Sequence, residues 1–129
     1  MLQERIEGKW IDCFARVFAR GKVEPGEAVA ILSESQSRPI NVQLAELALH
    51  QLGAQPFHIV IPTPAQSAPV PIRSTGASDV IQNIRPIVGA LASTTFVVDC
   101  TVEGLLHAPE LAEILQGGAR VLMISNEHP

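Results

Sequence analysis

The stretch that decides the fold is EPGEAVAILSE, residues 24 to 34. Pro25 and Gly26 predict a turn, and an unbroken apolar run from Ala28 to Leu32 follows it. A run without polar alternation is typical of a strand that is buried on both faces, as strands of parallel sheets are. We therefore expect this strand to belong to a parallel sheet.

Helices are predicted on both sides of this strand. After it, SRPINVQLAELALHQLGA (37–54) offers Ser37 as N-cap, Pro39 in the first turn and Gly53 as the stop. Before it, an apolar stripe predicts an amphipathic helix that ends near Gly21, with Cys13 on its apolar face as a small hydrophobe. The stripe consists of Ile6, Trp10, Cys13, Phe14, Val17 and Phe18.

The alternation of strands and helices continues to the end of the chain. A proline-rich stretch over 62–76 predicts an extended loop, and the helical pattern after it, from about Ser78 to Leu91, should kink at Pro86. The remaining predicted elements are strands over 57–61, 94–100 and 120–125 and a short helix over 109–116. Strands separated by helices indicate right-handed βαβ units. We predict a single α/β domain over 1–129, a Rossmann-like three-layer fold with a parallel sheet of about four strands and helices on both faces.

Composition and charge describe an ordinary globular chain. Of its 129 residues 47% are hydrophobic and 17% charged, and the net charge is -4. Lysine and arginine are not clustered, which argues against nucleic acid as a partner. No apolar run approaches the roughly 18 residues of a membrane span, and the amino terminus lacks the pattern of a secretory signal. We expect a cytoplasmic protein with Cys13 and Cys100 as free thiols, no membrane partner and a homo-oligomeric state.

Several common motifs are absent from the sequence. The loop SESQSRP after the first strand has no glycine that would let backbone amides approach a phosphate. No HExxH, CxxC or His-x-Asp spacing suggests a metal site, and no GxSxG elbow suggests a nucleophilic serine. Ser33, Ser35 and Ser37 in that loop either line a polar pocket or serve turns and capping. Ser33 is our candidate for a substrate contact.

VVDCTVEGLLHAPE, residues 97 to 110, is the strongest candidate site. Asp99 falls at the carboxyl end of a predicted strand, where ligands of parallel α/β sheets bind, so it is a second candidate for substrate binding. Leu105 and Leu106 should turn back onto the core. His107 precedes Pro109 and Glu110, which suit the first turn of a helix. A helix amino terminus disfavours the imidazolium, so His107 is either a neutral base or a surface residue at a helix start.

The chain resembles the amino-terminal domain of the 2,5-dihydroxypyridine 5,6-dioxygenase family and of the related aminopeptidase T-like metallopeptidases. One block, GEAVAILSESQSRPINVQLAELALHQLGAQPFHIVIPTP (26–64), is similar to the family's first strand, helix and second strand. A second, FVVDCTVEGLLHAPELAEILQGGARVLMISNEHP (96–129), is similar to its next strand, its Leu-Leu-His-small-Pro-Glu turn and a Gly-x-Arg-hydrophobic strand. The opening helix and residues 62 to 95 agree in pattern only.

The resemblance implies a function for a longer protein. Such dioxygenases open a hydroxylated pyridine ring in nicotinate degradation, and a longer carboxyl-terminal region supplies two histidines and an aspartate to non-haem Fe(II). His107 stands on the family position suited to deprotonating a ring hydroxyl of the aromatic substrate. We expect no metal or cofactor in this chain, Fe(II) in the complete enzyme, and no activity of the chain alone.

Three possibilities remain open at this point. The parent protein is either the dioxygenase or an aminopeptidase-like relative with its own metal centre. A third possibility is a non-catalytic α/β binding or assembly module, whose opening helix presents Trp10, Phe14 and Phe18 to a partner.

Overall fold

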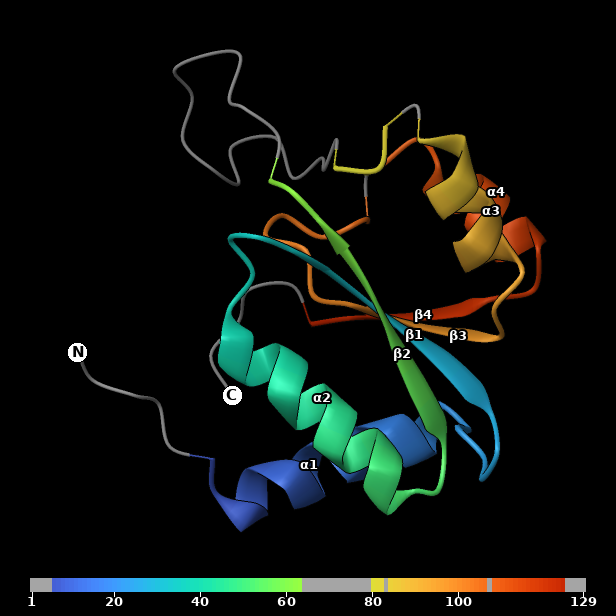
Figure 1. Ribbon diagram of the computed structural model, residues 1–129. Coiled ribbons are helices and arrows are strands. Elements are labelled where there is room, and N and C mark those ends of the chain that lie inside the picture. The colour runs from blue at the N-terminus through green and yellow to red at the C-terminus, as the bar shows by residue number, and fades with distance from the viewer. Residues whose placement is uncertain (1–5, 64–79, 83, 107, 125–129) are drawn as a thin grey trace.

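The structure is a computed structural model that describes residues 6–63, 80–82, 84–106 and 108–124. Helices and strands alternate along the chain, as predicted (Figure 1). The elements are α1 (Gly8–Arg20), β1 (Ala28–Glu34), α2 (Pro39–Gln51), β2 (Gln55–Ile61), α3 (Arg85–Ala92), β3 (Phe96–Asp99), α4 (Leu111–Gln116) and β4 (Arg120–Met123). Most of the loop predicted over 62–76 lies outside the described residues, as does His107.

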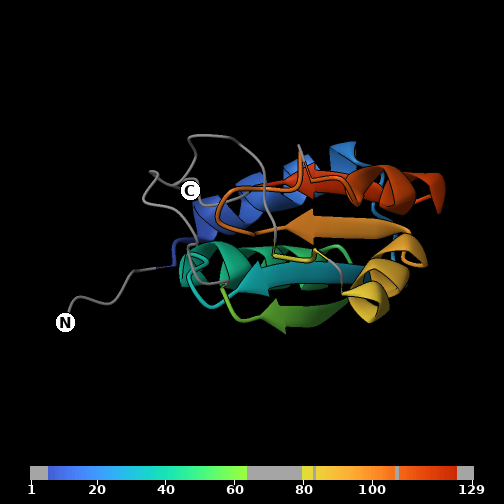
Figure 2. The ribbon, with the colours of Figure 1, turned by 90° about the horizontal axis from the view of Figure 1, so that it is seen from above.

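The sheet is four-stranded with the order β2-β1-β3-β4, and every pairing is parallel. Figure 2 shows the strand arrows pointing in one direction. β1 pairs with β2 on one side and β3 on the other, with Leu32 opposite both Ile59 and Asp99. This interior position explains the unbroken apolar run, because both faces of β1 are covered. The predicted α/β class and parallel sheet are confirmed.

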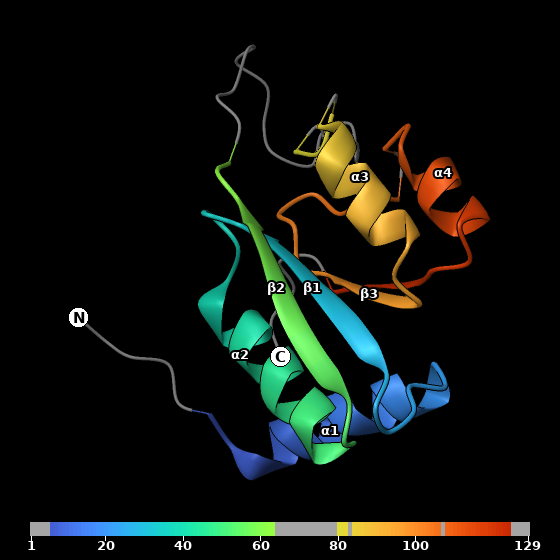
Figure 3. The ribbon, with the colours of Figure 1, turned by 45° about the vertical axis from the view of Figure 1, so that its right-hand side comes forward.

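The sheet separates two layers of helices (Figure 3). Val29 and Ile31 of β1 pack into one core with the helices α1 and α2. Ala30 and Leu32 point to the opposite face and pack into a second core with α3 and α4. The three-layer arrangement therefore follows from the alternation of side chains along one buried strand.

The opening helix α1 packs on its own domain. Phe18 is fully buried, and its ring makes edge-to-face contacts with Phe14 and with Phe96 of β3, with centroids 6.2 Å apart in both pairs. Trp10 is only partly buried. Cys13 is exposed, so the prediction that it packs as a small hydrophobe is wrong. Both cysteines are free thiols, as predicted.

Proline and serine positions correct three predicted details. Pro86 lies in the first turn of α3, where its missing amide costs nothing, so it helps begin a helix rather than kink one. Pro109 lies in a turn ahead of α4, whose N-cap is Glu110. The N-cap of α2 is Arg38, without a side-chain capping bond, and the predicted cap Ser37 instead accepts the Glu34 amide and donates to the Cys100 carbonyl. Leu105 is buried as predicted, but the prediction that Leu106 turns back onto the core is wrong, because Leu106 is 61% exposed.

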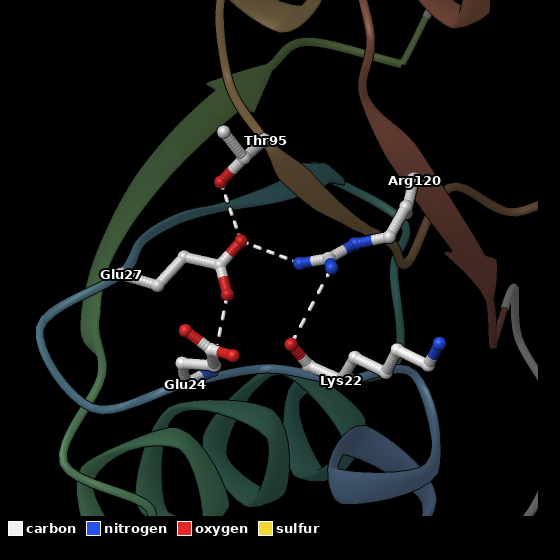
Figure 4. A network of polar contacts seen from close by, with 5 residues as sticks. All are labelled: Lys22, Glu24, Glu27, Thr95 and Arg120. Atoms are coloured by element: carbon white, nitrogen blue, oxygen red, sulfur yellow. Dashed lines mark hydrogen bonds and ion pairs between the residues drawn. The ribbon is translucent and has the colours of Figure 1, made fainter.

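A polar network ties the amino ends of the strands together, at the end of the sheet away from Asp99 (Figure 4). The Glu27 Oε2 atom accepts bonds from the Arg120 guanidinium and the Thr95 hydroxyl, each at 2.5 Å. Glu27 Oε1 accepts the Glu24 amide at 3.0 Å, and Arg120 also donates to the Lys22 carbonyl at 3.4 Å. Three segments are thereby joined: the α1–β1 connection with Lys22, Glu24 and Glu27, the residue Thr95 just before β3, and Arg120 of β4. Within the described residues, no helix is both long enough and apolar enough to cross a membrane.

Two glycines give a matched test of the α3–α4 packing. A Cβ on Gly117 would lie 2.2 Å from the Ala92 carbonyl oxygen, whereas a Cβ on Gly89 meets nothing within 4 Å. We expect Gly117→Ala to lower the free energy of unfolding by about 1–3 kcal/mol through overpacking. Gly89→Ala should raise it by about 0.5–1 kcal/mol, because alanine loses less entropy in a helix. Urea unfolding of both variants checks this, and equal stabilities would contradict the packing.

Candidate functional site

Two carboxylates mark the carboxyl end of the sheet. Asp99 ends β3 opposite Leu32, and Glu34 ends β1 two residues further on, so the side chains of all three lie on the α3–α4 face. Asp99 is 0% exposed and Glu34 is 6% exposed. Buried ionisable groups at this edge need hydrogen-bond partners, and the loop after β3 supplies them.

Asp99 organises the loop that follows it. Its Oδ1 atom accepts bonds from the Thr101 amide at 3.0 Å and the Thr101 hydroxyl at 2.5 Å. Its Oδ2 atom accepts the Leu105 amide at 2.7 Å. The Thr101 oxygen in turn accepts the Gly104 amide at 3.1 Å, and Gly104 has a φ of 80°, which glycine adopts without strain. One carboxylate thus closes a turn of seven residues, 99 to 105.

Burial is the main cause that raises the pKa of Asp99 above its usual range. The hydrogen bonds from Thr101 and Leu105 oppose this effect by stabilising the ionised form, and the charge of Glu34 adds to it. The same burial raises the pKa of the Cys100 thiol to about 12, with a further contribution from Asp99. A thiol held this firmly in its protonated form does not serve as a nucleophile.

Glu34 and Ser37 hold the same loop from the side of β1. Glu34 Oε2 accepts the Val102 amide at 2.9 Å. The Ser37 hydroxyl donates to the Cys100 carbonyl at 2.6 Å and accepts the Glu34 amide at 2.8 Å. The side chains of Glu34 and Ser37 therefore join the end of β1 and the loop after it to the backbone that follows β3. Sequence reasoning missed Glu34, although an acid two positions after the apolar run was a usable signal.

A second link joins the ends of β1 and β2. The Ser35 hydroxyl donates to the Thr63 hydroxyl at 3.1 Å and accepts the Thr63 amide at 2.8 Å, and Thr63 Oγ1 also accepts the Gln36 amide. Both serines 35 and 37 thus serve turns, which is the structural one of the two roles left open for them. The links at this edge fix three neighbouring loops relative to one another.

The structure does not bring the two predicted substrate contacts, Ser33 and Asp99, together. Ser33 is 4% exposed and, by the alternation of β1, its side chain points to the α1–α2 face. Asp99 points to the α3–α4 face and bonds to its own loop. The substrate-binding roles of both residues stay predictions.

His107, the predicted base, lies outside the described residues, but residues on both sides of it are anchored. Leu105 is fully buried and bonded to Asp99, and Ala108 is 6% exposed. The Ala108 amide also donates to the Leu105 carbonyl at 3.0 Å. Leu105 and Ala108 both pack into the core under α3 and α4.

The pKa of Asp99 predicts a specific dependence of stability on pH. Because this pKa is raised on folding, the folded state keeps the Asp99 proton to a higher pH than the unfolded chain does. Stability contributed by Asp99 is therefore present below its ordinary pKa and lost as pH rises through the raised value. The free energy of unfolding of the wild type minus that of Asp99→Asn should fall as pH rises through this window.

Chemical denaturation at a series of pH values measures this difference. The matched control is the same comparison made in chains that also carry Glu34→Gln. This substitution removes the nearby charge that helps to raise the pKa of Asp99, so the difference in free energy of unfolding should fall less with pH. A difference that grows with pH would mean that the hydrogen bonds outweigh burial, and would contradict the prediction.

Among the described residues, no three His, Cys, Asp or Glu side chains are grouped so as to hold a metal ion. What this edge contains is a set of buried acceptors and hydroxyl groups that fix loops around the carboxyl ends of β1 and β3. This is the edge at which α/β sheets bind ligands.

Comparison with solved structures shows that the chain has a known fold. The chain matches the 2,5-dihydroxypyridine dioxygenase from Pseudomonas putida KT2440 with a TM-score of 0.82 and 25% identity, over 95% of this chain. It spans only 35% of that enzyme's length. NpsA of Klebsiella oxytoca, in complex with 3-hydroxyanthranilyl-AMSN, shares the fold at a TM-score of 0.53 and 19% identity, over 95% of this chain and 20% of NpsA.

Comparison of sequences assigns the family. No curated protein matches the chain. A family model described as NicX, 2,5-dihydroxypyridine 5,6-dioxygenase, matches residues 9–129, which is nearly the whole chain. The chain therefore belongs to the 2,5-dihydroxypyridine 5,6-dioxygenase family.

Proposed function

We propose that this chain is the amino-terminal α/β domain of a dioxygenase that opens the ring of a hydroxylated pyridine in nicotinate degradation. The family match over residues 9–129 is the observation that carries the proposal. The structural match to the Pseudomonas enzyme supports it. These findings favour the dioxygenase over the aminopeptidase-like relative and over a non-catalytic module. Because the chain spans 35% of that enzyme, the activity belongs to a longer protein.

In this proposal the domain contributes the substrate-side base, His107. A general base must come within about 2.6–3.2 Å of the proton that it removes. Leu105 and Ala108 are buried at the carboxyl edge of the sheet, where α/β folds bind ligands, which supports a substrate close to the short stretch that contains His107. His107 then accepts the proton of a ring hydroxyl and leaves a more electron-rich ring.

The Fe(II) that we expect in the complete enzyme does not fit the described part of this chain. No metal-binding group of three side chains occurs among residues 6–63, 80–82, 84–106 and 108–124. We propose that iron is held by the remainder of the longer protein, where it would supply oxygen activation. The tasks of this domain are to orient the substrate and to move a proton.

Substitution of His107 in the complete protein tests the proposal. We expect His107→Ala to lower kcat for 2,5-dihydroxypyridine by about 10²–10⁴-fold, which is the usual contribution of a general base. The limb of the pH–rate profile that reports the base should disappear, while iron content stays unchanged. Ring opening is measured as the loss of the substrate's ultraviolet absorbance.

His50→Ala is the matched control, since His50 is exposed on α2 and should not affect turnover. Retention of full kcat by His107→Ala would overturn the base role. Stoichiometric tight iron together with turnover by residues 1–129 alone would overturn the division of labour between the domains.

A further inference from the structure

The loop that leads to His107 is held by two buried carboxylates that reach it from different strands. Asp99 on β3 binds the amides of Thr101 and Leu105, and Glu34 on β1 binds the amide of Val102. Such an arrangement fixes backbone amides near the start of the loop, at Thr101 and Val102, and at its end, at Leu105.

Asp99 has no exposed surface to offer a substrate. Its side chain is 0% exposed, and both carboxylate oxygens point into its own loop, where they accept three bonds. Its partners are all donors: the Thr101 hydroxyl accepts the Gly104 amide, so its own proton is directed to Asp99. Both terminal atoms of the side chain at position 99 must therefore be hydrogen-bond acceptors.

We propose that Asp99 is a positioning residue, which fixes the loop from Thr101 to Leu105 and does not touch the substrate. Glu34 assists by fixing the Val102 amide from the neighbouring strand. The inference rests on the proposed function, because the loop that is positioned leads to His107. It assigns Asp99 a different role from the substrate contact that its place on the sheet suggested.

The geometry distinguishes the two carboxylates by what an amide replacement does to each. Asparagine at position 99 has one acceptor atom and one donor group, so it cannot satisfy Thr101 and Leu105 together. Glutamine at position 34 can still present its single oxygen to Val102. Loss of charge alone therefore cannot explain a difference between the two variants.

Kinetics of the complete protein provide the first test. We expect Asp99→Asn to lower kcat by about 10–100-fold, which is usual when a supporting hydrogen bond of a functional group is lost, with KM changed by less than about threefold. Glu34→Gln should lower kcat by no more than about threefold, and Glu34→Ala by about tenfold. Asp12→Asn is the matched control, because Asp12 is exposed on α1, far from this loop, and should leave both constants unchanged.

A double-mutant cycle separates positioning from general loss of structure. If Asp99 acts through His107, the variant with both Asp99→Asn and His107→Ala should turn over no more slowly than His107→Ala alone. Multiplied effects in the double variant would overturn the proposal. A rise in KM at unchanged kcat would also overturn it, because Asp99 would then contact the substrate.

Amide hydrogen exchange tests the positioning independently of His107. Asp99→Asn should speed exchange at Leu105 at least about tenfold, whereas Glu34→Gln should not. If His107→Ala keeps full activity, the base role fails, and the Leu105 exchange still decides whether Asp99 fixes the turn. If Asp99→Asn does not fold, Glu34→Ala against Glu34→Gln decides: equal exchange at Val102 and equal kcat in that pair would overturn the proposal.

Discussion

Burial of β1 on both faces is the constraint on which the rest of the structure depends. From Val29 to Glu34 every residue of this strand is buried, so each face must be covered by a helical layer. The strand stays buried to its last residue, and this residue is an acid. Because a buried carboxylate needs a partner, the Val102 amide of the neighbouring loop comes to Glu34. Burial of β1 on both faces thus accounts for the two cores and for the contact between Glu34 and the loop after β3.

The two ends of the sheet use polar groups for different purposes. At the amino end, Arg120 of β4 forms an ion pair with Glu27, which precedes β1. The resulting network joins the starts of the strands to one another. At the carboxyl end, the carboxylates bind backbone amides of a loop rather than cations. Asp99 and Glu34 together fix three amides of one loop, whereas Glu27 at the amino end binds one amide, that of Glu24, besides its ion pair with Arg120. The carboxyl end is thereby suited to place a functional group accurately.

Membership of the dihydroxypyridine dioxygenase family gives this loop its significance. A domain that covers 35% of the related enzyme need not hold the metal to take part in the reaction. In the proposed division of labour, the domain contributes a base and the scaffold that aims it, and the remainder of the protein contributes iron. Turnover in such an arrangement depends on small displacements of the loop, because misplacement of about 1 Å can cost about a hundredfold in rate.

The sequence by itself determined the α/β class, the parallel sheet and the approximate position of each strand, because hydrophobic periodicity and turn residues are local signals. It also located residues 97–110 at the carboxyl edge of the sheet. The roles within that stretch were decided only by tertiary structure. Ser37 bonds to Cys100 and Glu34 to Val102, and these partners are 63 and 68 positions apart in the chain. Ser33 and Asp99 point to opposite faces for the same reason: strand register, which no local pattern records, decides which side chains meet.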